Sequence, residues 1–375
     1  MAYGIGTLAL ETLIGPAARA TEALARLDER LARSPVRDGW IERQHFADAA
    51  AALWLEGELV HLEDLVLHGA HMDIRLPTHE LTQAHAVLRA RRQIFAHKPT
   101  WALSADGLRQ LIRRDRVAQP GAPAGTGGGD TGRAAVVEPA LESAAPPDQL
   151  STALAAMDSQ LERTANVLED SKTLPEPETS APTDRPSLVY DSEWDEDARL
   201  AEWQEVIANT RSLPAVLRAA IIIDAWSEID VLQRAAWLGP LLVSALLRQE
   251  GIAAHHLASL HLGAKQIPRE RRRARSRTDR LVALLDAIHE AARLGLKEHD
   301  RLMLAKGQME RRLTERRSNS RLPDLIALVL SRPLVSSGMI QQALKVSKQG
   351  ALNLVGELGL REMTGRGRFR GWGVM

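Results

Sequence analysis

Apolar residues recur every three to four positions through much of this 375-residue chain, and this spacing constrains its fold more than any other feature. Residues 21–31 and 42–60 both place apolar side chains along one face of a helix. A further stretch of this kind begins after Thr78, a residue type that caps helices. Runs that resemble strands are hard to find before residue 359. The sequence therefore predicts a mainly α-helical protein.

Two low-complexity segments divide the helical regions. Residues 119–147 are dominated by Gly, Pro, Ala and Ser, and residues 173–186 are rich in proline. Such compositions are typical of linkers. Between them lies an apolar stripe with heptad-like spacing, which predicts a single helix near 148–171. Its members are Leu150, Leu154, Met157, Leu161 and Leu168.

These boundaries predict four parts. They are an N-terminal helical domain (1–118), a linker with one helix (119–187), a second helical region (188–318) and a C-terminal domain (319–375). In the second helical region, another apolar stripe consists of Leu281, Leu285, Ile288 and Ala292.

The C-terminal domain has the layout of a helix-turn-helix. A short apolar helix is expected before Pro333, and a second helix is expected to start with Ser336 or Ser337 as its N-cap. After a three-residue turn, Ser347 caps a third helix that ends at Gly359. Two helices joined by so short a turn are typical of helix-turn-helix domains.

Strand-like residues after the third helix predict a wing. Two such runs flank Gly365-Arg366-Gly367, which can form the turn of a β-hairpin. The domain is therefore a predicted winged helix-turn-helix. Lys345 departs from the usual pattern because glycine is common at that place in the turn. A left-handed backbone at Lys345 would cost roughly 1 kcal/mol.

The third helix offers side chains that can read DNA bases. Its predicted buried face consists of Ala351, Leu352, Val355 and Leu358. Lys348, Gln349 and Asn353 then point outward. Amides of Gln and Asn suit adenine N6 and N7, and Lys suits guanine O6 and N7. The wing arginines predicted to contact phosphates or the minor groove are Arg366, Arg368 and Arg370.

Charge is unevenly distributed along the chain. Its totals of 48 Lys and Arg and 48 Asp and Glu balance, but from Lys265 onward there are 24 basic and 11 acidic residues. This asymmetry indicates an anionic partner, with nucleic acid foremost. The possible phosphate contacts in the basic run after Pro268 are Arg271, Arg272, Arg273 and Arg275. Alternatively, this run is an exposed helix face that acidic residues elsewhere balance.

Other side chains indicate neither catalysis nor metal binding. The absence of cysteine excludes disulfides, thiolate zinc sites, iron–sulfur clusters and cysteine nucleophiles. Seven histidines lie between His45 and His97, but His79, Glu80 and His85 lack the H-E-x-x-H spacing. We predict no catalytic residue, no metal site and no cofactor. Because no secretory signal or membrane-spanning run is recognisable, we expect a cytoplasmic protein without membrane contact.

Several motifs resemble those of a rhizobial and related α-proteobacterial family whose members are often plasmid-borne. They include HLEDLVLHGAHMDIRLPTHELTQAHAVLRARR, YDSEWDEDARLAEW, IPRERRRAR, GLKEHDR, SRLPDLIALVLSRPLVSSGMI and LGLREMTGRGRFRGWGV. The resemblance covers nearly the whole chain. It implies a helical domain of unknown function joined to a C-terminal helix-turn-helix DNA-binding domain.

The order of parts is more distantly similar to that of Fic-domain proteins. AALWLEGELVHLEDLVL and LPAVLRAAIIIDAWSEIDVLQRAAWLGPLLVSALLRQEG carry this resemblance. Fic enzymes transfer nucleotidyl groups with the motif H-P-F-x-(D/E)-G-N-G-R, in which His is the base. The corresponding positions are residues 229–237, where Ile229 replaces that His and Trp237 the final Arg. The resemblance implies a Fic-like scaffold without catalysis.

Together these features predict a non-enzymatic transcriptional regulator that binds double-stranded DNA with the helix at 348–358. The apolar stripes at 150–168 and 281–292, and the paired half-sites that helix-turn-helix dimers bind, predict a homodimer. One alternative is a Fic-related nucleotidyl transferase, or an inactive Fic-like regulator or antitoxin. Another is a plasmid maintenance protein.

Overall fold

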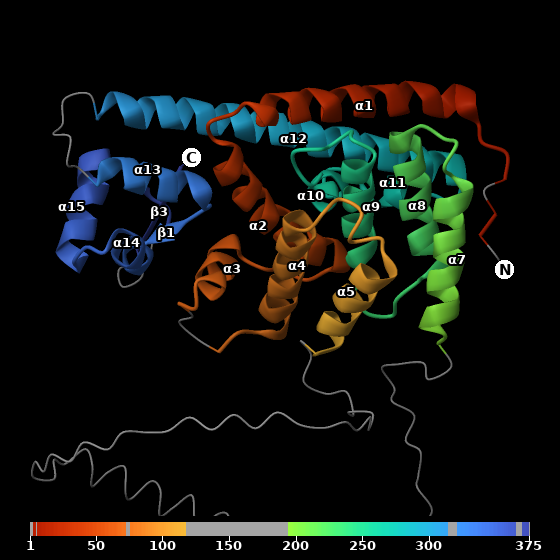
Figure 1. The fold of residues 1–375 in the computed structure, drawn as a ribbon, viewed down its shortest axis with the longest axis horizontal. Helices are drawn as coiled ribbons and strands as arrows, with labels where there is room; N and C mark the ends of the chain where they lie inside the picture. The colour runs from red at the N-terminus through yellow and green to blue at the C-terminus, as the bar shows by residue number, and fades with distance from the viewer. Residues whose placement is uncertain are drawn as a thin grey trace, which may run out of the picture. The chain divides into compact units, whose positions relative to one another are not determined.

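The computed structural model describes residues 3–4, 6–72, 76–117, 194–313, 321–364 and 370–374. These residues form a mainly helical body followed by a C-terminal winged helix-turn-helix, which confirms the predicted fold class (Figure 1). The body contains α1 (Leu10–Ala32), α2 (Arg37–Glu56), α3 (Leu62–Gly69), α4 (His79–Ala96), α5 (Ala105–Val117), α7 (Glu196–Asn209), α8 (Ala215–Ile229), α9 (Leu238–Gln249), α10 (Leu260–Ala264), α11 (Arg269–Arg272) and α12 (Arg277–Arg311).

The C-terminal domain is smaller and mixed. Its elements are α13 (Leu322–Ser331), β1 (Val335–Ser336), α14 (Ser337–Leu344), α15 (Lys348–Leu358), β2 (Arg361–Glu362) and β3 (Gly371–Gly373). The expectation of no strand before residue 359 is wrong at one point, because β1 precedes α14. A strand of two residues is too short to show an alternating pattern.

The long helix α12 connects most parts of the body. It has 35 residues, which at 1.5 Å per residue is about 50 Å. It runs beside α1 and also contacts α2, α8, α10, α11 and α13 (Figure 1). Gly295 permits the close approach of α1, since a Cβ there would lie 2.7 Å from Leu27 Cδ2. At the same point, Trp40 Nε1 donates to the Gly295 carbonyl oxygen at 2.9 Å.

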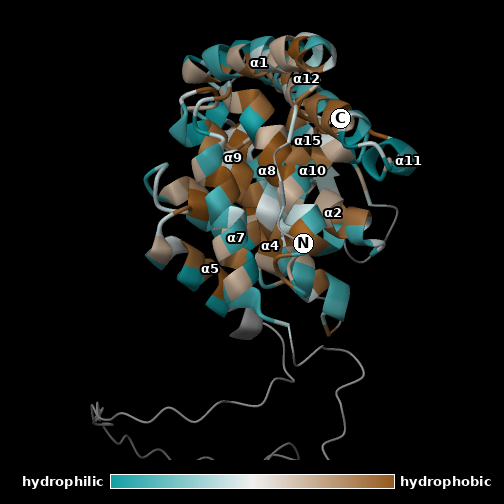
Figure 2. Cartoon of the chain, turned by 90° about the vertical axis from the view of Figure 1, so that its right-hand side faces the viewer, coloured by the Kyte–Doolittle hydropathy of each residue, from teal (hydrophilic) through white to brown (hydrophobic). Residues whose placement is uncertain are grey.

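Helix α8 forms the centre of the apolar core. Nearly all of its residues are buried, and it contacts α1, α7, α9 and α12. A helix with so many apolar side chains around its circumference needs such extensive coverage. In Figure 2, α8 is largely brown, the colour of hydrophobic residues, whereas the short α11 is largely teal, the colour of hydrophilic residues.

A buried polar cluster joins the two helical regions of the sequence. Asp48 of α2 forms an ion pair with Arg91 of α4, and both side chains are fully buried. Asp48 Oδ2 also accepts a hydrogen bond from His261 Nδ1 of α10 at 2.9 Å. The segments before residue 118 and after residue 193 therefore share one core. The predicted boundaries at 118/119, 187/188 and 318/319, both linkers and the helix at 148–171 lie outside the described residues.

The second apolar stripe does not support the predicted homodimer. Leu281, Leu285, Ile288 and Ala292 lie on α12 and are buried in the core of their own chain. This face is already covered, so it is not available to a second copy. The other stripe, at 150–168, lies outside the described residues, and the homodimer stays a prediction.

Candidate nucleic-acid interface

Three helices and a small sheet build the C-terminal domain. The strand order is β1-β3-β2 with antiparallel pairing, and Trp372 of β3 lies opposite Val335 on one side and Glu362 on the other. The Trp372 and Val335 side chains are buried with Ala351 and Leu358 of α15. Since α13 contacts both β3 and α15, the sheet and the helix predicted to contact DNA belong to one small core.

Local side-chain chemistry sets the turn and the ends of the helices. Ser336 is the N-cap of α14, and Ser347 Oγ accepts a hydrogen bond from Gly350 N at 3.1 Å as the N-cap of α15. Lys345 has φ +54°, so the left-handed conformation anticipated for this turn is present. Gly359, at φ +61°, ends α15 as predicted.

The predicted base-reading residues share the exposed face of α15. Lys348, Gln349 and Asn353 are all exposed, whereas Ala351, Val355 and Leu358 are buried. Leu352 is only half-buried, although the sequence placed it on the buried face. The exposed residues lie toward the N-terminal half of α15, which is the part of a recognition helix that contacts base edges.

Two of these side chains are already ordered by each other. Gln349 Nε2 donates a hydrogen bond to Asn353 Oδ1 at 3.0 Å. Residues four apart on a helix face the same way, so this pairing fits their positions. Gln349 Oε1 remains a potential acceptor, and the Asn353 amide remains a potential donor.

The wing arginines are only partly described. Arg366 and Arg368 lie outside the described residues, as does the turn between them. Arg370 is exposed, but its Nε donates to Glu362 Oε2 at 2.8 Å and its guanidinium lies 5.5 Å from the Trp372 ring centre. Glu362 could not be recognised from the sequence as the partner of Arg370, because their proximity depends on the strand register.

The basic run lies at the other end of α12 from the winged helix. Arg271 pairs with Asp286 at 2.7 Å between Nη2 and Oδ2, and the half-buried Arg272 donates from Nε to the Ile267 carbonyl oxygen at 3.0 Å. Arg273 and Arg275 are exposed. Because α11 contacts α12 beside its N-terminal end and α13 follows its C-terminal end, the structure does not bring these arginines to α15 (Figure 1).

Arginine contacts seat the winged helix on the helical body. Arg43 of α2 donates from Nη1 to the carbonyl oxygens of Val329, at 3.3 Å, and Arg332. Its Nε also donates to Glu298 Oε1 of α12 at 2.9 Å. Nearby, Gly39 packs so closely on α13 that a Cβ would lie 2.8 Å from the Leu330 carbonyl oxygen. The predicted base-reading face of α15 stays exposed in this arrangement.

Comparison with known proteins identifies both parts of this arrangement. Residues 188–314 match a family described as a protein of unknown function (DUF1612), and residues 322–375 match a helix-turn-helix DNA-binding domain. An uncharacterized protein, y4cF of Sinorhizobium fredii, is 48% identical over the whole of both chains. The chain belongs to the y4cF family. The predicted resemblance to a rhizobial family with this domain order is confirmed.

In this member of the y4cF family, the DNA-binding domain includes α15 and the wing. The resemblance to Fic proteins stays a prediction, and the nine residues aligned with the Fic motif extend from the end of α8 to the residue before α9. Within the described ranges, no three His, Asp or Glu side chains are grouped to hold a metal ion. None of the helices described is both long and apolar enough to cross a membrane.

Proposed function

We propose that this protein is a non-enzymatic transcriptional regulator that acts in the cytoplasm and binds double-stranded DNA through its C-terminal domain. The observation that carries the proposal is the simultaneous exposure of Lys348, Gln349 and Asn353 on α15 while the domain is seated on the body. Because these side chains are uncovered, DNA binding requires no prior release of the winged helix.

In the proposed complex, α15 enters the major groove with its N-terminal half toward the bases. Gln349 and Asn353 offer both an amide acceptor and amide donors, which is the combination that adenine N7 and N6 require. Lys348 supplies donors for guanine O6 and N7. These contacts would provide sequence selectivity.

In this proposal, the wing and its arginines supply the electrostatic contribution to DNA binding. Arg370 directly precedes β3 and pairs with Glu362 of β2, and it would exchange this carboxylate for a DNA phosphate on binding. Phosphate contacts of this kind raise affinity for every sequence and make binding sensitive to salt. The wing therefore contributes affinity, and α15 contributes selectivity.

The test is selection of bound duplexes from a random pool, with the full-length chain and a variant carrying Lys348→Ala, Gln349→Ala and Asn353→Ala. We expect the wild type to enrich a defined sequence and the variant to enrich none while still binding duplexes at low salt. Gln110→Ala, which removes an exposed amide on α5, is the control and should select the wild-type sequence. Failure of the wild type to retard any duplex at low salt would refute the proposal.

A further inference from the structure

The helical body contains a cavity of about 1,070 Å³ beside the start of α12. Its walls come from the end of α2, from α8 and α9, and from the segment that leads through α10 and α11 into α12. Its basic lining residues are Lys265, Arg269, Arg272, Arg273, Arg275 and Arg280. Ligand sites are usually concave and up to about 1,000 Å³, so this volume suits a small molecule.

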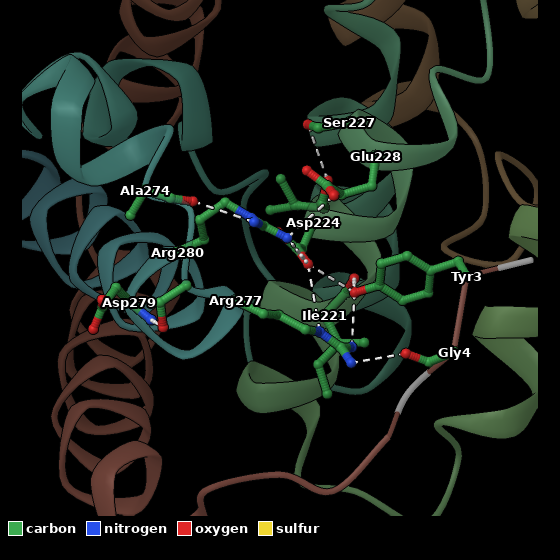
Figure 3. Close-up of polar contacts among 12 residues, drawn as sticks. Tyr3, Gly4, Ile221, Asp224, Ser227, Glu228, Ala274, Arg277, Asp279 and Arg280 are labelled. Atoms are coloured by element: carbon green, nitrogen blue, oxygen red, sulfur yellow. Dashed lines mark hydrogen bonds and ion pairs between the residues drawn. The ribbon is translucent and has the colours of Figure 1, made fainter. Parts of the chain in front are cut away.

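Three acidic side chains, Glu56, Asp224 and Glu228, line this cavity, and two of them pair with the same arginine. Asp224 and Glu228 of α8 line it and both bind Arg280, whose Nε lies 2.7 Å from Asp224 Oδ1. Figure 3 shows Asp224 between Arg280 and Tyr3, whose hydroxyl donates to Asp224 Oδ2 at 2.8 Å. The charge of Arg280 is therefore balanced within the protein.

Three other arginines of the lining differ in this respect. The exposed side chains of Arg269, Arg273 and Arg275 have no ion pair among the described residues. They surround the half-buried Arg272, whose pKa is lowered first by burial and then by the charges of Arg273 and Arg269. Six basic side chains against three acidic ones give the lining a net positive charge, which favours a multivalent anion there.

The shape and chemistry of this space distinguish a small ligand from DNA. These arginines line a concavity, whereas a DNA backbone needs an open surface or a groove wide enough for a duplex. Planar guanidinium groups match phosphate oxygens through paired hydrogen bonds. The cavity wall also includes Trp54, an aromatic side chain that is 42% exposed and lies 5.0 Å from Lys265 Nζ. An aromatic face next to cationic groups suits a phosphorylated molecule with a planar ring.

We propose that this cavity binds a phosphorylated small molecule of nucleotide size with at least two negative charges. The site is separate from the DNA-binding surface, so it goes beyond the proposed function. The helix α12 lines the cavity with Arg280 near its start and reaches the winged helix through Arg301, which donates to the Val374 carbonyl oxygen. A single continuous element thus connects the cavity to the DNA-binding domain.

The experiment is isothermal titration calorimetry of the full-length protein with pyrophosphate, ATP and adenosine. We expect pyrophosphate and ATP to bind and adenosine, which lacks phosphate, to bind far more weakly. Arg273→Ala combined with Arg275→Ala should weaken the binding of ATP about tenfold or more. Both side chains are exposed, so their removal leaves the core intact.

A matched control separates local contacts from overall charge. Arg33→Ala combined with Arg211→Ala removes the same charge from exposed positions outside the cavity, and it should leave ATP binding unchanged. Three results would overturn the proposal. The first is that the wild type binds neither pyrophosphate nor ATP. The second is that the two double variants lose the same amount of ATP affinity. The third is that the variant with Arg273→Ala and Arg275→Ala loses duplex binding but keeps ATP binding.

Discussion

Gln349 Nε2 donates a hydrogen bond to Asn353 Oδ1 at 3.0 Å, one turn further along the exposed face of α15. This contact limits the rotamers of two flexible amides before any DNA is bound. Side chains that are ordered in advance lose less conformational entropy on binding. In the proposed complex the pair would act as one recognition unit on adenine, and its two members should not contribute independently.

The first prediction concerns this coupling. Gln349→Ala and Asn353→Ala should each weaken binding to the selected duplex by roughly 1–3 kcal/mol, because each removes one side of a base contact. The double variant should lose less than the sum, with a coupling energy of about 0.5 kcal/mol or more. Fluorescence anisotropy of a labelled duplex measures all three losses. Strictly additive losses would show that the two amides act separately.

The second prediction concerns the wing. Glu362→Gln removes the carboxylate that holds Arg370, so it should strengthen binding to duplexes of any sequence. The slope of log affinity against log salt should become steeper by up to about one unit, because the wild type leaves the Glu362 carboxylate unpaired near the DNA when Arg370 takes a phosphate and the variant does not. Glu29→Gln, which makes the same charge change on α1, is the control. An unchanged slope would contradict a phosphate contact by Arg370.

The third prediction concerns the helix-turn-helix turn. Lys345 occupies the left-handed region at φ +54°, where a Cβ is unfavourable. Lys345→Gly should therefore raise the free energy of unfolding by about 1 kcal/mol. Lys345→Ala removes the same charge but keeps the Cβ, so it should bring no such gain. Urea denaturation compares the two variants, and equal stabilities would argue against backbone strain at this position.

The fourth prediction concerns pH. Burial, together with the charge of nearby His68, lowers the pKa of His85 from 6.5 to about 4. The unfolded chain therefore takes up this proton near pH 6.5 and the folded chain only near pH 4, so the folded state loses stability as pH falls through this interval. His85→Gln should reduce the difference in unfolding free energy between pH 7 and pH 5. The exposed His79→Gln should keep the wild-type difference, and the same result in both variants would refute this assignment.

The fifth prediction concerns the seat of the winged helix. Arg43→Ala removes the donor to the Val329 and Arg332 carbonyls and one partner of Glu298, at a cost of roughly 1.5–3 kcal/mol. Amide hydrogen exchange should then rise in α13, while α8 at the centre of the body stays protected. Arg92→Ala, which breaks a more exposed ion pair with Glu42, is the control. Equal exchange in α13 for both variants would show that Arg43 does not hold the domain.

Local chemistry made much of the C-terminal domain predictable. Ser347, Gly359 and Lys345 each act within a few residues of their own position, through a cap or a backbone conformation. The outward face of α15 could be predicted for the same reason, since a helical period of 3.6 residues sorts buried from exposed positions. The helical period alone did not predict the half-exposed position of Leu352, because the depth of burial of a side chain depends on what packs above it.

Long-range contacts could not be predicted in this way. Asp48 and His261 are separated by 213 residues, and their types alone do not reveal that they meet. The stripe from Leu281 to Ala292 shows a second limit, because an apolar face needs a cover but does not specify whether it comes from the same chain. The cavity arginines show a third limit of prediction from sequence, since a basic run looks the same whether it lines a concavity or an open surface.

The most direct test of the account is the ratio of two affinities at one salt concentration. Anisotropy titrations would give the dissociation constants of the selected duplex and of a scrambled duplex for the wild type and for the Lys348, Gln349 and Asn353 triple alanine variant. We predict that the wild type prefers the selected duplex by about 1,000-fold or more, as specific binders do, and that the variant binds both duplexes with nearly equal, weaker affinity. A variant that keeps the wild-type ratio would show that α15 does not read the sequence.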